Sequence, residues 1–214
     1  MAISSTLLLV LFGLLLIGGL SGVVGTYTFL RKNTLVGDAI AHGVLPGVAI
    51  GFMLSGTKDP WMLLICGAAF GYIAIRSIEA IAAHSKLSMD SAIAIVTSVF
   101  FALGSVFLSF ISSQENGQQA GLQDFLFGKA ATMTEQDVLT FAITSVIILF
   151  TVGLMYKPFM LLCFNEDFAA SRGWKTKRHV HLLSLITVIV ITIGLQAVGV
   201  VLMSALLIAP AAAA

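Results

Sequence analysis

Six long apolar segments separated by short polar joins are the feature that most limits how this 214-residue chain can fold. Each segment offers about 20 mostly apolar residues, the length that a helix needs to cross the hydrocarbon of a bilayer. The segments cover residues 6–30, 35–55, 60–81, 90–112, 137–157 and 180–209. Only 10% of the residues are charged, whereas a soluble domain carries about 25%. We therefore expect an all-α protein, a polytopic transmembrane helical bundle of about six spans that forms one domain over residues 1–214.

The apolar segments also exclude several other classes of protein. They are continuous rather than alternating, which argues against a transmembrane β-barrel. The net charge is +1 and no basic patch is interleaved with aromatic residues, so we expect membrane lipid and no nucleic acid around the protein. Segment 6–30 lacks a basic leader and is too long for a signal peptide, so it is expected to be the first span. The sequence stops just after an apolar segment, which suggests truncation from a longer protein with further C-terminal helices.

The distribution of lysine and arginine predicts the orientation. Nine of these residues lie at or near the first, third and fifth joins, and two lie at the second and fourth joins. Basic residues concentrate on the cytoplasmic side of membrane proteins. The odd-numbered joins are therefore predicted to be cytoplasmic and the N-terminus to be outside. The nine residues are Arg31, Lys32, Arg76, Lys86, Lys157, Arg172, Lys175, Lys177 and Arg178.

Asp38 and His42 stand four residues apart inside the second apolar segment. On a helix this spacing places both side chains on one face, one turn apart. Ionisable residues at membrane depth are costly and by default mark a polar pathway. A carboxylate and an imidazole together can bind a divalent first-row metal. If the cytoplasmic surface lies near Lys32, His42 lies about 15 Å into the bilayer. The alternative is that Asp38 caps the helix and His42 is an ordinary core histidine.

The residues that follow His42 predict a locally weakened helix. Pro46 has no N–H and leaves the carbonyl of His42 without its usual helical partner. Gly43 and Gly47 flank this position and favour a break beside the Asp38/His42 pair. Irregular backbone at membrane depth is tolerated where it lines a cavity or is buried in protein. Two ligands do not complete a metal shell, so other helices, carbonyls, water or a second subunit would supply the rest.

Two short helices are expected outside the six spans. Residues 121–128 are apolar but too short to cross a bilayer, and they predict an interfacial or re-entrant helix. Residues 165–179 lie within the fifth join, which runs from 157 to 179, and there Glu166 and Asp167 would occupy the first turn of a short helix that ends near Gly173. Such a helix can lie on the membrane surface or dock into a partner. No phosphate-binding loop is present, because the tripeptide at 128–130 lacks a serine or threonine after the lysine.

Several motifs in order along the chain resemble one family, the membrane permeases of ABC-type manganese, zinc and iron importers. The second-helix motif GDAIAHGVLPG at 37–47 looks like the signature of that family. The other matching motifs are DSAIAI at 90–95, FFALG at 100–104, FLFG at 125–128, DFA at 167–169 with Gly173, VG at 198–199 and ALLIAPA at 205–211. Each motif is weak alone, but the ordered set covers nearly the whole chain.

The resemblance implies a plasma-membrane permease of a prokaryote. It implies a homodimer or pair of related permeases, two cytoplasmic ATP-binding subunits and an extracellular solute-binding protein. Asp38 and His42 map onto the family's metal path. The join at 165–179 looks like the coupling helix that contacts the ATPase. The residues expected at this contact are Glu166, Asp167, Phe168, Arg172 and Gly173.

We therefore expect a transport subunit rather than an enzyme, with ATP hydrolysed by a partner chain. The cargo is expected to be a divalent metal, with manganese ahead of zinc or iron, and no cofactor is expected to be permanently bound. The variant residues at 44–46 and 100–104 look closer to the manganese and iron members. Two alternatives stay open, a proton-coupled secondary metal transporter and an ABC permease of the vitamin or siderophore type. The alternative for the fifth join is a plain interfacial helix.

Overall fold

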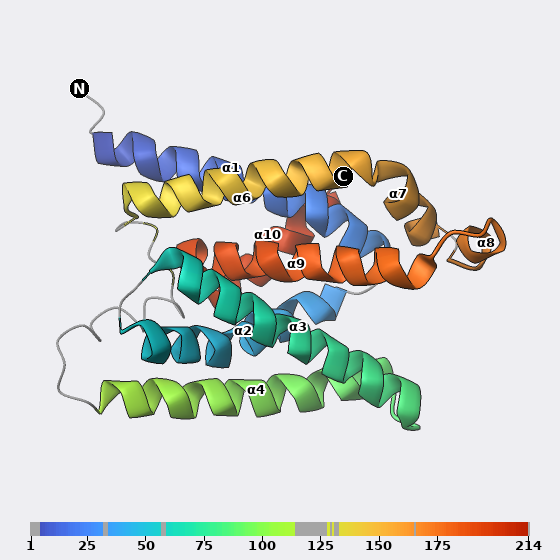
Figure 1. Ribbon diagram of the computed structural model, residues 1–214, viewed down its shortest axis with the longest axis horizontal. Helices are drawn as coiled ribbons and strands as arrows, with labels where there is room; N and C mark the ends of the chain where they lie inside the picture. The colour runs from blue at the N-terminus through green and yellow to red at the C-terminus, as the bar shows by residue number, and fades with distance from the viewer. Residues whose placement is uncertain are drawn as a thin grey trace.

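The computed structural model (Figure 1) describes residues 5–31, 34–56, 59–113, 128, 130, 133–164 and 166–213. These residues form helices and connecting turns, and the described part contains no strand. The helices are α1 (Ser5–Leu30), α2 (Thr34–Ser55), α3 (Pro60–His84), α4 (Met89–Ser112), α6 (Glu135–Leu154), α7 (Tyr156–Phe164), α8 (Glu166–Ser171), α9 (Thr176–Val198) and α10 (Val200–Ala213).

Six of these helices are long and apolar enough to cross a membrane, which confirms the expected all-α bundle. They are α1, α2, α3, α4, α6 and α9. Their axes run roughly along the long dimension of the molecule (Figure 1). α2 packs between α3 and α4, while α9 contacts α1, α3 and α2. α2 and α9 are the most deeply buried spans, and α4 at the edge of the bundle is the least buried.

Polar residues in the joins fix where several helices begin. The carboxylate of Asp59 accepts a hydrogen bond from the backbone N–H of Trp61 at 3.1 Å and caps α3. At the start of α6, the hydroxyl of Thr134 accepts from the N–H of Asp137, whose carboxylate accepts from the N–H of Thr134. This reciprocal pair satisfies two N–H groups that the first turn of a helix leaves free.

The last apolar segment differs from the single span expected over 180–209. It divides at Gly199 into the spanning helix α9 and the shorter helix α10. Gly199 has φ of 82°, a left-handed conformation that glycine adopts without steric cost and that ends a right-handed helix. α10 then packs against α1, where a side chain at Gly25 would collide with the carbonyl oxygen of Leu207.

The short helix expected at 121–128 lies outside the described residues except for Gly128. That glycine has φ of 86° and packs closely on the backbone at the break between α9 and α10. A Cβ atom at Gly128 would lie 2.4 Å from the carbonyl carbon of Val198. The approach therefore needs a residue without a side chain at this point.

Candidate metal path

Asp38 and His42 lie on adjacent turns of α2, as their spacing predicts. The Oδ2 atom of Asp38 and the Nε2 atom of His42 are 3.9 Å apart. This distance is beyond hydrogen-bond range, so the two groups face one another without a direct bond. Asp38 lies four residues inside α2, which begins at Thr34, and therefore does not cap the helix.

The pair is half open to its surroundings rather than enclosed within the helix bundle. The side chain of Asp38 is 51% exposed and that of His42 is 24% exposed. The neighbouring residues Ala39, Ile40 and Ala41 are fully buried, so α2 presents its apolar residues to the bundle and the acid to an open face. The Nδ1 atom of His42 is buried and has no hydrogen-bond partner among the described residues. The other ring nitrogen, Nε2, is the one that faces the carboxylate.

An aromatic ring from α4 holds the imidazole from the side. The rings of His42 and Phe101 have centroids 5.2 Å apart and planes at 84°, an edge-to-face arrangement. Such pairs restrict ring orientation and contribute about 0.5–1.5 kcal/mol beyond simple burial. The sequence alone does not predict that Phe101 contacts His42, because the two residues come from different helices. Phe101 does lie in the FFALG motif at 100–104, one of the motifs that resemble the permease family.

The expected helix break beside the pair is wrong, because α2 continues without interruption through Pro46. Close packing on both sides of the helix holds it in place. On one side, a Cβ atom at Gly47 would lie 2.4 Å from the carbonyl oxygen of Cys66 in α3. On the other side, Pro46 and Leu45 fill the space that Gly104 leaves open in α4. Proline weakens a helix locally, and here the neighbouring helices keep the backbone helical.

Gly43 and Gly47 therefore mark a helix crossing. A Cβ atom at Gly43 would lie 2.6 Å from the Cβ of Ala74, again in α3. Glycines four residues apart allow two membrane helices to approach closely. The two glycines and Pro46 support the pair by fixing α2 between its neighbours.

The fifth join forms the short helix α8, which projects at one end of the bundle (Figure 1). Its end is a Schellman motif, in which the N–H of Gly173 bonds the carbonyl of Ala170 and the N–H of Trp174 bonds that of Ala169. Gly173 takes the left-handed φ of 77° that this motif requires.

The surface of α8 carries an exposed aromatic and a cation. Phe168 is 46% exposed, and the guanidinium of Arg172 lies over its ring at 5.3 Å from the centroid. Glu166 and Asp167 belong to the first turn of α8, and their side chains lie outside the described part of the structure. The residues expected to contact an ATPase lie in or next to α8, whereas the Asp38/His42 pair lies in α2.

Comparison with known proteins agrees with the fold and with the family resemblance. Residues 4–214 match the model of the ABC 3 transport family. The manganese transport system membrane protein MntC of Bacillus subtilis (strain 168) is 43% identical over 202 residues, which cover 94% of this chain and 46% of that protein. The zinc transport system membrane protein TroC of Treponema pallidum (strain Nichols) is 38% identical over 209 residues, covering 98% of this chain and 70% of that one.

A solved structure has the same architecture. PsaBC from Streptococcus pneumoniae, determined in complex with a Fab, superposes with a TM-score of 0.86 at 31% sequence identity. The match covers 98% of this chain and 72% of that one. The chain spans just under half the length of the Bacillus protein and about 70% of the Treponema protein. With its family model matched over nearly every residue and its spans in the same arrangement, the chain is a multi-pass membrane protein of the ABC 3 transport family.

Proposed function

We propose that this chain is the membrane-spanning permease subunit of an ABC importer that moves a divalent transition metal into the cytoplasm. Membership of the ABC 3 transport family supports the transporter class. Relatives named for manganese and zinc transport support a metal cargo. Manganese is the first candidate, and zinc and iron are the alternatives. Oxygen and imidazole ligands suit all three metals.

The Asp38/His42 pair is the observation that carries this proposal. Zinc–oxygen and zinc–imidazole bonds, for example, are each about 2.0–2.2 Å long. Two such bonds can span the 3.9 Å between Oδ2 of Asp38 and Nε2 of His42 without movement of the backbone. A pair that supplies only two ligands binds an ion weakly, which suits a path that the ion must leave. We assign these two residues to the metal path.

The open face beside Asp38 supports a second permease copy. A carboxylate that faces lipid at membrane depth is costly, and the Asp38 side chain is half exposed. The described residues contain no group of three histidine, cysteine, aspartate or glutamate side chains that could hold an ion. A partner permease packed over this face would shield the acid and could contribute further ligands or enclose water. The permease homodimer is therefore part of the proposal.

The coupling of transport to ATP is assigned to the join at 165–179. The exposed ring of Phe168 and the neighbouring guanidinium of Arg172 give α8 an apolar and basic surface that suits docking to another protein. α8 lies at the end of the bundle that carries most of the cations, which is the cytoplasmic end by the positive-inside rule. We place ATP-binding subunits there and a metal-carrying solute-binding protein at the opposite end.

Metal uptake by the complete transporter tests the assignment of the pair. Asp38→Asn and His42→Ala should each lower the initial rate of manganese uptake by about tenfold or more, because metal ligands tolerate substitution poorly. The matched controls are Asp59→Asn, which keeps a capping side chain, and His84→Ala, an exposed histidine. Uptake at the wild-type rate in both path variants would refute the metal-path assignment.

The same assay separates the alternatives. A proton-coupled secondary transporter would take up metal without ATP and without a bound ATPase. A vitamin or siderophore permease would tolerate Asp38→Asn and would not take up free metal. Competition between manganese, zinc and iron in the wild-type assay would rank the cargo.

A further inference from the structure

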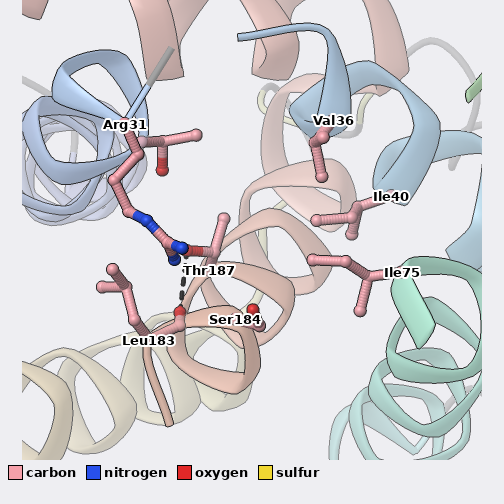
Figure 2. A pocket seen from close by; sticks show the side chains of 8 residues that line it. Arg31, Val36, Ile40, Ile75, Leu183, Ser184 and Thr187 are labelled. Atoms are coloured by element: carbon pink, nitrogen blue, oxygen red, sulfur yellow. Dashed lines mark hydrogen bonds between the residues drawn. The ribbon is translucent and has the colours of Figure 1, made fainter. Parts of the chain in front are cut away.

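A second polar feature lies away from the Asp38/His42 pair, in a pocket between α1, α2, α3 and α9 (Figure 2). About 300 Å³ of space free of protein atoms, including the open mouth, lies between the lining side chains. The lining residues are Thr28, Arg31, Val36, Ile40, Ile75, Leu183, Ser184 and Thr187.

The lining combines hydrogen-bond donors on one side with an apolar wall on the other. The half-buried guanidinium of Arg31 extends from α1 toward α9, near Leu183 and Thr187 (Figure 2). A guanidinium carries five N–H donors and a fixed positive charge, so it can bond the protein and an oxyanion at the same time. The hydroxyl of Ser184 adds a further donor at the pocket. Opposite them, Val36, Ile40 and Ile75 present only carbon.

The two threonine hydroxyls of the pocket cannot donate to a ligand. Thr28 donates to the carbonyl of Val24 and Thr187 donates to that of Leu183, each one turn earlier in its own helix. A hydroxyl has a single hydrogen, so these oxygens can only accept. The donors that remain for an anion are therefore the hydroxyl of Ser184 and those N–H groups of Arg31 that do not bond the protein.

The pocket lies at a membrane boundary. Arg31 directly follows Leu7–Leu30, the first span. Further cationic and polar groups lie next to the lining residues Ile75 and Leu183 in sequence: Nη1 of Arg76 is 3.3 Å from Nδ1 of His181, and Arg76 also pairs with Glu79. Basic pockets between transmembrane helices at this depth suit lipid headgroups.

We propose that this pocket binds the phosphate group of an anionic membrane phospholipid. The phosphate oxygens accept from Arg31 and Ser184, while the glycerol and acyl carbons extend out of the mouth of the pocket. A soluble phosphate ion would use the same donors. The boundary position, directly after the first span, favours the lipid. The pocket is separate from the metal path, so lipid binding and metal uptake can fail independently.

Lipid retention by the purified transporter complex tests this site. The complex is exchanged into nanodiscs that contain equal amounts of phosphatidylglycerol and phosphatidylcholine, and the lipid that stays bound is measured by native mass spectrometry. The wild type should retain phosphatidylglycerol in preference. Arg31→Gln should reduce that preference about tenfold, since hydrogen bonds to charged groups contribute about 1.5–3 kcal/mol. Ser184→Ala should reduce it about threefold, because it removes one neutral donor.

Lys177→Gln is the matched control, because it removes an exposed cation from the same end of α9. It should change the preference by less than about twofold, as expected for a screened surface charge. If Arg31→Gln does not fold, Arg31→Lys keeps the charge but loses the planar fork, and should give an intermediate preference.

Two results would overturn the proposal. One is retention of phosphatidylglycerol by Arg31→Gln and Ser184→Ala at the wild-type level. The other is binding of inorganic phosphate that depends on Arg31, measured by equilibrium dialysis, without any preference for phosphatidylglycerol. That second result would assign the pocket to a soluble anion.

Discussion

Asp38 and His42 share one face of α2, but their polar atoms differ in how far they are exposed. The carboxylate is half exposed, and the buried Nδ1 atom of the imidazole has no protein partner in the described structure. Neither group gains a strong bond from the other at 3.9 Å. Their position stabilises the fold little, which supports a role in handling a ligand.

Phe101 is predicted to orient the imidazole rather than to bind metal. Phe101→Leu keeps an apolar side chain but removes the ring edge that contacts His42. Loss of an aromatic pair costs about 0.5–1.5 kcal/mol, so the KM for metal uptake should rise by roughly 2–10-fold. The maximal rate should change less. The measurement is the concentration dependence of manganese uptake.

Phe110→Leu is the control for that substitution, because Phe110 is an exposed phenylalanine of the same helix. It should leave the KM unchanged. An equal rise in KM for both variants would contradict the specific role of Phe101.

The pairing of Asp38 with His42 could be predicted from the sequence, since both residues lie on one helix and the spacing fixes the face. The contact with Phe101 could not be predicted, because nothing local relates two residues on different helices. The orphaned Nδ1 atom could not be predicted either, because burial of one ring nitrogen depends on packing of the surrounding helices.

Among the helices, the crossing of α2 and α3 is the tightest constraint on the position of the pair. Gly47→Ala would place a methyl group 2.4 Å from a backbone oxygen of α3, where relief requires the helices to separate. We expect a loss of about 1–3 kcal/mol in stability. Thermal unfolding of the purified permease in detergent should show the lower midpoint.

Gly18→Ala is the matched comparison, because nothing lies within 4 Å of a Cβ at that position in α1. Alanine favours helix over glycine by up to about 1 kcal/mol, so this variant should be as stable as the wild type or slightly more stable. Equal destabilisation by both substitutions would mean that close approach at Gly47 does not hold the crossing.

The positions of the spans were predictable, because the bilayer requires long apolar segments that are visible in any window of the sequence. The break at Gly199 was missed, since the flanking residues are as apolar as the span itself and one glycine carries little signal. A clue was available in the length of segment 180–209, which exceeds the ordinary span. The helix break predicted at Pro46 is absent for a different reason. Contacts from α3 and α4 keep α2 helical although proline weakens it locally.

For the whole molecule, orientation in the membrane is the property on which the direction of transport depends. With Cys66 and Cys163 replaced, single cysteines at Ser113 and Ser171 lie exposed at the end of α4 and in α8 respectively. An impermeant maleimide added to intact cells should label Ser113→Cys and should spare Ser171→Cys until the cells are opened. The reverse pattern would place the N-terminus inside.

Contact between the transported metal and His42 can be detected directly when the metal is manganese. Pulsed electron paramagnetic resonance on the manganese-loaded transporter should detect a nitrogen-14 coupling from an imidazole ligand. The coupling should disappear in His42→Ala and persist in His84→Ala. A coupling that survives in His42→Ala would contradict this contact, because the nitrogen ligand would then come from another residue.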